Sequence, residues 1–345
     1  DTSPAGIAQT EKEEKAFAGK CAARVGDDVL EHVGTREVVQ DMDVIRSVLG
    51  DAKLTYVGFS YGTRIGTSYA EKFPANVRAM VLDGALDPEA SPVQELIGQA
   101  TGFEGAFTAF AKDCATRAGC PLGDDPAQFD ARFRALTVPL IASPVPTEGP
   151  RGLGYNDAVT GTLQALYSPQ LWPALTTGLA QLTQGRGDTL LKLADVYSGR
   201  GPDGHYSHED DAFTAIRCVD DPPVTDRAVT DAADAAYRTA APFLDDGMGS
   251  GRAPLNTCAF WPVPHTGTPH APKVVGLAPT VVISTTGDPA TPYQAGVQLA
   301  RQLGGALITY RGTQHTVAFD GVSCVDDAVS TYLTELRTPP PGLTC

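Results

Sequence analysis

The stretch LTYVGFSYGTRIG, residues 54–66, decides the fold that this sequence predicts. It begins as an apolar, β-type run and continues as a helix. Between the two, residues 58–62 match the pattern G-x-S-x-G with Ser60 at the centre, the only such match in the chain. The pattern is typical of a turn from strand to helix that is too sharp for bulky flanking residues. We therefore expect the turn to push the Ser60 hydroxyl out of the edge of a sheet.

Strands and helices alternate around this turn. Residues 35–50 are predicted as a helix, with Thr35 as its N-cap and Gly50 at its end, and a second helix is expected over residues 63–73. A buried strand follows over residues 77–88. The order helix, strand, sharp turn, helix, strand predicts an α/β protein and, more narrowly, the middle of an α/β-hydrolase sheet.

A long helical segment interrupts this alternation. Residues 89–275 are predicted as mostly helical, and strands return only from residue 279, with a helix over 293–304 between them. We therefore predict three parts in the chain. Residues 1–88 form the first part of the hydrolase core with the sharp turn, residues 89–275 form a helical cap inserted after the sixth strand, and residues 276–345 complete the core.

A serine hydroxyl needs a base within hydrogen-bond reach and a third group that orients the base. In hydrolases with this turn, the order along the chain is serine, acid, histidine. Asp288 follows one predicted strand and His315 follows the next. We therefore predict Ser60 as the nucleophile, His315 as general base and then general acid, and Asp288 as the group that fixes the imidazole tautomer. The backbone N–H of Tyr61 is predicted to stabilise the oxyanion.

Other interpretations of the charged residues stay open at this point. Asp83 and Asp87, after the preceding strand, are rival candidates for the acid, although Asp83 and its glycine neighbour also fit an ordinary turn. In the segment HYSHEDD, His205, His208 and Glu209 could bind a metal ion. A solvated loop is the simpler interpretation, because neither a helix nor a third placed ligand supports a site. The predicted mechanism itself needs no cofactor and no metal.

The composition excludes several classes of partner. The chain of 345 residues is 42% hydrophobic, which is ordinary for a folded soluble protein. Its 41 acidic and 26 basic residues give a formal net charge of −15, and no cluster of Lys and Arg could follow a run of phosphates. Nucleic acid is therefore not an expected partner. A membrane span is not expected either, since no apolar run approaches the roughly 20 residues that a spanning helix needs.

Seven cysteines occur without the C-x-x-C pairs or Cys–His groups that hold zinc, so disulfides are the better interpretation. The simplest pairing follows the order along the chain: Cys114–Cys120, Cys218–Cys258 and Cys324–Cys345. Six cysteines allow fifteen connectivities, so the sequence alone does not choose among them. Cys21 is left over, either as a buried free thiol or with a partner outside this sequence. Three bridges would place the protein outside the reducing cytosol.

Several segments together resemble a known family. They are DMDVIRSVLG, the run from YVGFSYG to LDGALDP, AIRCVDD, and the run from TVVISTTGD to RGTQHT. These segments resemble the secreted tripeptidyl aminopeptidases of actinobacteria, which have the α/β-hydrolase fold, and look similar to the cell-envelope serine protease of mycobacteria within that family. The resemblance spans nearly the whole chain. It implies an exported serine peptidase, secreted or in the cell envelope, that removes short peptides from free N-termini or cuts selected proteins.

The resemblance also implies residues that bind the substrate. In the family, a threonine three residues after the acid matters for activity, and Thr291 occupies the matching position, where it could instead be a helix N-cap. A cap that recognises a free amine needs carboxylates to pair with it. The candidates are Asp220 and Asp221, with the acidic residues 209–211 upstream, although a solvated surface position is the simpler interpretation of each one.

One departure from the family pattern is large. Family members carry further strands before the sharp turn, together with a glycine-rich loop that supplies a second oxyanion N–H. Here two predicted helices and one strand precede Ser60, and no such loop does. We therefore expect N-terminal strands to be missing from this chain, and an N-terminal segment of the same protein to associate with it. The unmatched Cys21 points in the same direction.

Three functions compete on these observations. A carboxylesterase or lipase would use the same triad as a peptidase, since both reactions pass through the same tetrahedral intermediate. A lipase is expected to show a broad apolar surface around its pocket, whereas the predicted cap is acidic and aromatic residues make up only 7% of the chain. Peptides or proteins are therefore the favoured substrates. A non-catalytic module is the third candidate, and the complete set of Ser60, Asp288 and His315 argues against it.

Overall fold

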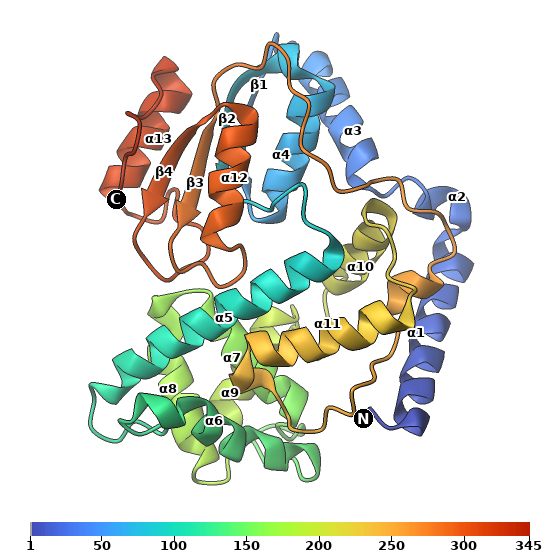
Figure 1. Cartoon of the computed structure of the whole chain (residues 1–345), viewed down its shortest axis with the longest axis vertical. Helices are drawn as coiled ribbons and strands as arrows, with labels where there is room; N and C mark the ends of the chain where they lie inside the picture. Colours follow the sequence, from blue (N-terminus) through green and yellow to red (C-terminus); the bar gives the residue numbers. More distant parts are fainter. Residues whose placement is uncertain (1) are drawn as a thin grey trace.

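A parallel β-sheet forms the centre of one part of the molecule. The structure is a computed structural model that describes residues 2–345 (Figure 1). Within this range the sheet has four strands in the order β1 (Leu54–Phe59), β2 (Val77–Asp83), β3 (Val281–Thr285) and β4 (Ala306–Tyr310). Each neighbouring pair is parallel, so the carboxyl ends of all strands meet at one edge. The predicted α/β class is confirmed.

Helices cover both faces of this sheet. One face packs against α3 (Thr35–Val48), α4 (Tyr61–Lys72) and α12 (Tyr293–Leu303), and the other against α13 (Ser323–Glu335). The central strand β2 serves both faces, because alternate side chains point to opposite sides. Met80 and Leu82 lie in the core under α4 and α12, whereas Ala79 and Val81 lie in the core under α13. Such burial on both sides explains why β2 is apolar throughout.

The chain between β2 and β3 adds no strand to the sheet in the described range. Its helices are α5 (Pro92–Ala115), α6 (Phe129–Thr137), α7 (Tyr155–Leu166), α8 (Trp172–Leu182), α9 (Asp188–Tyr197), α10 (Glu209–Asp220) and α11 (Arg227–Ala240). Most of them form a separate layer below the sheet (Figure 1), with its own core in which the rings of Phe107 and Phe243 stack 4.4 Å apart. In the described residues this helical segment follows the second strand, β2. The prediction that it follows the sixth strand counts strands as they are numbered in the family.

The N-terminal helix α1 (Pro4–Val25) packs against this helical layer rather than the sheet (Figure 1). Glu11 accepts the backbone N–H of Leu255 at 3.0 Å and pairs with Arg227 of α11 at 2.5 Å. The short helix α2 (Asp27–Leu30) then leads to α3. The predicted division places all of residues 1–88 with the sheet. Nothing in the sequence indicates the position of α1, because the partners of its charged side chains lie far along the chain.

The structure corrects two predicted helix starts and one strand end. The N-cap of α3 is Gly34, not Thr35, because a distant carboxylate rather than a local side chain accepts the first amide. Helix α4 begins at Tyr61, directly after the serine, two residues earlier than predicted. Strand β2 ends at Asp83 rather than continuing to residue 88.

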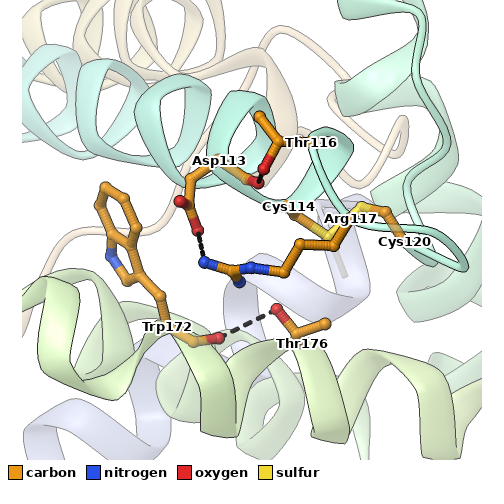
Figure 2. The surroundings of a disulfide bond; sticks show 7 residues. All are labelled: Asp113, Cys114, Thr116, Arg117, Cys120, Trp172 and Thr176. Atoms are coloured by element: carbon orange, nitrogen blue, oxygen red, sulfur yellow. Dashed lines mark hydrogen bonds and ion pairs between the residues drawn. A yellow bond between two sulfur atoms is a disulfide. The ribbon is translucent and has the colours of Figure 1, made fainter.

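Three disulfides link cysteines of the described range in the simplest pairing, Cys114–Cys120, Cys218–Cys258 and Cys324–Cys345. Figure 2 shows the first of these at the end of α5, beside the ion pair of Arg117 with Asp113 and opposite Trp172 and Thr176 of α8. Cys21 is a free thiol that is only partly buried, and burial raises its pKa.

Neither a membrane span nor a metal cluster is found in the described part of the chain. Over residues 2–345, no helix combines the length and the apolar character that crossing a bilayer requires. The same residues hold no group of three His, Cys, Asp or Glu side chains arranged to bind a metal ion, and His205, His208 and Glu209 are exposed.

Candidate active site

The sharp turn between β1 and α4 carries Ser60 in a strained conformation. Its φ is 52° and its ψ is −119°, a region that residues with a Cβ rarely adopt. A Cβ at Gly58 would lie 2.5 Å from the carbonyl oxygen of Gly62, so this flank accepts only glycine. The Ser60 N–H donates to the carbonyl of Asp83 at 2.9 Å, which ties the turn to the end of β2. These features are those of a nucleophile elbow.

His315 and Asp288 meet at the same edge of the sheet. His315 follows β4, and its Nδ1 lies 2.9 Å and 3.1 Å from the two carboxylate oxygens of Asp288, which follows β3. Both side chains are buried or nearly so. The carboxylate accepts from Nδ1–H, so this pair leaves the other ring nitrogen, Nε2, free to take a proton.

Asp288 is itself held by the loop that follows it. Its Oδ1 accepts the backbone N–H groups of Ala290 and Thr291, each at 2.9 Å, and its Oδ2 accepts the Thr291 hydroxyl at 3.0 Å. Thr291 Oγ1 also lies 3.4 Å from His315 Nδ1. Helix α12 begins two residues later with Pro292 as its N-cap, so Thr291 does not have the capping role that was its alternative. The threonine therefore orients the acid and contacts the base.

Gly84 brings the elbow and the His–Asp pair together. It follows Asp83, whose carbonyl accepts the Ser60 N–H. A Cβ at Gly84 would lie 3.0 Å from His315 Cε1 and 3.2 Å from Thr291 Oγ1, so the absence of a side chain allows the histidine to approach. Within residues 2–345, Ser60 Oγ and His315 share no direct hydrogen bond, an arrangement common in hydrolases without substrate.

The rival acids have other partners. Asp83 Oδ2 accepts the backbone N–H groups of Val317 and Ala318, each at 2.7 Å, and so fixes the loop just after His315. Asp87 lies beyond the strand and accepts the N–H of Glu89 at 3.0 Å. His315 Nδ1 is directed at Asp288, which is the arrangement predicted for the acid.

Asp83 is expected to make the stability of the protein depend on pH. Burial raises its pKa to about 6, with Asp288 adding to the rise. The folded state therefore binds this proton more tightly than the unfolded state, and the resulting stability is lost as the pH rises from about 4 to about 6. The free energy of unfolding of wild type, relative to Asp83→Asn, is expected to fall by about 2 kcal/mol between pH 4 and pH 7. Urea unfolding of wild type and Asp83→Asn across this pH range measures the two free energies of unfolding. A difference between them that does not change with pH would contradict the prediction.

The helical layer contacts the histidine directly. The backbone carbonyl of Tyr167, just after α7, accepts the backbone N–H of His315 at 2.9 Å, and the two rings meet edge to face with centroids 5.3 Å apart. Sequence reasoning missed Tyr167, because a tyrosine at a helix end carries no signal for a partner so far along the chain. The layer thus forms one wall of the site.

Tyr61, the predicted oxyanion donor, directly follows Ser60 at the start of α4. Its N–H is the first amide of α4, and the first four amides of a helix have no partner within that helix. The positive end of the helix dipole also favours a developing negative charge there.

The structure gives both Asp220 and Asp221 partners within the chain. Asp220 accepts hydrogen bonds from Thr35 and Tyr61, and Asp221 forms ion pairs at 2.7 Å with both Arg64 and Arg217.

Asp220 and Asp221 line a cavity of about 270 Å³ beside α4. None of Ser60, Asp288 and His315 lines that cavity. The substrate-binding role predicted for these two carboxylates stays a prediction. Residues 209–211 are exposed in the first turn of α10, where acidic side chains favour the helix dipole.

The fold and the site define a class of protein: a hydrolase of α/β architecture with a nucleophile elbow and a histidine–aspartate pair at the carboxyl edge of its sheet. The family model described as "alpha/beta hydrolase fold" matches residues 3–322. The chain belongs to this α/β-hydrolase family.

Curated relatives agree with the family resemblance seen in the sequence. The chain is 54% identical over 352 residues to "Serine protease Hip1" of Mycobacterium tuberculosis, covering 100% of this chain and 68% of that protein. It is 53% identical over 347 residues to "Carboxylesterase B" of the same organism, covering 100% of this chain and 66% of the relative. "Tripeptidyl aminopeptidase" of Streptomyces lividans is 29% identical over 342 residues, covering 96% of this chain and 61% of that protein. The chain thus spans about two thirds of the length of the mycobacterial relatives.

Proposed function

We propose that the protein is a serine peptidase that acts through an acyl-enzyme. The observation that carries this proposal is the pairing of His315 with the buried carboxylate of Asp288, next to Ser60 in a nucleophile elbow. The similarity to a protein named as a serine protease and to one named as a tripeptidyl aminopeptidase supports it.

The proposed reaction runs in two halves. Ser60 Oγ attacks the carbonyl carbon of the scissile bond while His315 Nε2 takes the hydroxyl proton, and the N–H of Tyr61 stabilises the oxyanion. The histidine then gives this proton to the leaving amine, and the acyl group stays on Ser60. In the second half, water attacks the acyl-enzyme with the same histidine as base, and Ser60 is restored. Asp288 keeps the proton on Nδ1 throughout.

The favoured substrates are peptides or proteins, and esters are the alternative. The alternative is supported by 53% identity to a protein named carboxylesterase B. Both reactions use the same residues, so the triad does not distinguish them. The acid-rich composition and the similarity to peptidases favour peptides.

An N-terminal segment of the same protein is proposed to complete the sheet and the oxyanion site. Strand β1 pairs only with β2 in the described range, so its other edge is free, and Phe59 at its end is 43% exposed. Helix α3, which precedes β1 in the chain, exposes Ile45 and Val48, and Leu49 just after it is exposed as well. An open strand edge and exposed apolar side chains suit the addition of another strand. The greater length of the mycobacterial relatives supports this proposal.

An extracytoplasmic location is proposed on similar grounds. Three disulfides within the described residues are typical of proteins that fold in an oxidising compartment. The family resemblance implies secretion or retention in the cell envelope.

Labelling with a serine-directed phosphonate tests the proposed function. In the protein expressed from its complete gene, we expect covalent labelling at Ser60, located by mass spectrometry, and none in Ser60→Ala. Cleavage of tripeptide substrates only when their amine is free would support an aminopeptidase, and cleavage of N-blocked peptides or of esters alone would favour an endopeptidase or an esterase. Residues 1–345 expressed alone should label much more slowly, and equal labelling would contradict the role of an N-terminal segment. A folded complete protein without a labelled Ser60 would overturn the peptidase proposal.

A further inference from the structure

We propose that Asp220 is a positioning residue, which holds the nucleophile elbow in its active shape by binding the side chain of Tyr61. This inference rests on the proposed function, because it assigns Asp220 a role in the same site. It differs from the amine-binding role that the sequence predicted for this residue, and it links the elbow to the helical layer.

Both carboxylate oxygens of Asp220 are used within the chain. Oδ2 accepts a short hydrogen bond from the Tyr61 hydroxyl, and Oδ1 accepts the backbone N–H of Thr35 at 2.8 Å. The Thr35 hydroxyl lies 3.0 Å from the Tyr61 hydroxyl, so the three residues form a closed set. Asp220 is only 3% exposed, which strengthens these hydrogen bonds and makes the loss of any one costly.

Two glycines leave room for this carboxylate and its backbone. A Cβ at Gly34 would lie 2.7 Å from Asp220 Oδ1, and a Cβ at Gly267 would lie 2.2 Å from the Asp220 carbonyl oxygen. Gly34 precedes α3 and Gly267 lies in the segment that returns from the helical layer to the sheet. Segments on both sides therefore fix the place of Asp220.

Ion pairs continue from this point to two helices of the other layer. Arg64 of α4 binds Asp221 at 2.7 Å and also donates to the Asp220 carbonyl at 3.2 Å. Arg217 of α10 binds Asp221 at 2.7 Å and Glu95 of α5 at 2.5 Å. Arginines and carboxylates alternate along this chain of ion pairs, so each charge has a partner of opposite sign, as buried charges require. It ties α4, which starts at the elbow, to α5 and α10.

The position of Tyr61 explains why this arrangement should affect the reaction. Tyr61 follows the strained Ser60 directly, and its own N–H is the proposed oxyanion donor. A strained backbone persists only where its surroundings fix it, and here Asp220 fixes the phenol while Arg64 lies 5.8 Å above the ring. If Tyr61 shifts, both the nucleophile and the oxyanion donor shift with it. A misplacement of about 1 Å can cost about a hundredfold in rate.

Asp220→Asn and Tyr61→Phe, made singly and together in the protein expressed from its complete gene, test this inference. We expect Asp220→Asn to lower kcat for p-nitrophenyl butyrate by about 10- to 100-fold and Tyr61→Phe by about 10-fold, with KM changed less than about threefold. The double variant should be no slower than Asp220→Asn within about twofold, because both changes remove the same interaction, the hydrogen bond from the Tyr61 hydroxyl to the charged carboxylate. The rate of phosphonate labelling should fall in parallel with kcat.

Asp226→Asn is the matched control, since Asp226 is an exposed N-cap of α11 and asparagine serves equally well there. It should keep wild-type kcat. Unchanged kcat in a folded Asp220→Asn, or multiplicative effects in the double variant, would overturn the inference. If Asp220→Asn does not fold, Tyr61→Phe alone decides, because it removes one hydroxyl and keeps the ring. A failure of the proposed function itself would be recognised separately: Ser60→Ala would then keep its activity, because Ser60 would not be the nucleophile.

Discussion

Replacing His315 with alanine is expected to lower kcat by about four to six orders of magnitude, with KM within about threefold of wild type. Nδ1 of this histidine faces both oxygens of a buried carboxylate at 2.9 Å and 3.1 Å, so the ring is held with Nε2 available as the base. A serine hydroxyl without a base is a weak nucleophile at neutral pH. Steady-state hydrolysis of p-nitrophenyl butyrate by the protein expressed from its complete gene measures the loss.

Two comparisons make this test sharp. The double variant Ser60→Ala and His315→Ala should be no slower than either single variant, because nucleophile and base act as one unit. His205→Ala is the matched control, since His205 is exposed in a loop of the helical layer, and it should keep full activity. More than about one hundredth of wild-type activity in His315→Ala would mean that another group is the base.

The core of this site could be predicted from the sequence because its signals are local. A strained turn needs glycine at its flanks, and the pattern at Gly58 and Gly62 states this need directly. Asp288 and His315 come just after strands, and parallel strands bring such positions to one edge. The three residues are far apart in the chain, yet the fold class alone predicts that they meet.

The contacts that the sequence did not predict have a common physical origin, since they involve side chains whose partners lie far away in sequence. Thr35 was predicted as an N-cap on its residue type, but its amide binds Asp220, 185 positions later. Asp220 and Asp221 look like free carboxylates in the sequence, and only the packing of α10 against α4 shows that arginines neutralise Asp221 and that Tyr61 occupies Asp220. Tyr167 likewise reaches the site through the arrangement of a separate layer.

Replacing Asp288 with asparagine is expected to lower kcat by about 10⁴-fold while leaving the fold intact. Asparagine keeps the volume of the side chain and one oxygen for the amides of Ala290 and Thr291, which donate to Oδ1 at 2.9 Å. The NH₂ group of asparagine, however, is a hydrogen-bond donor, and it would replace an oxygen that now accepts hydrogen bonds from His315 and from the Thr291 hydroxyl. The imidazole must then carry its proton on Nε2, so it no longer accepts the proton of Ser60. Steady-state kinetics and circular dichroism of the same preparation measure both expectations.

Asp83→Asn is the comparison that decides between the two candidate acids. If the acid is Asp288, Asp83→Asn should lose less than about tenfold in kcat, because asparagine can still accept the Val317 and Ala318 amides that Asp83 Oδ2 accepts at 2.7 Å. If Asp83 were the acid, the two results would be reversed, and Asp288→Asn would be the mild change. Since His315 Nδ1 lies within hydrogen-bond distance of both Asp288 oxygens, the large loss is expected at Asp288.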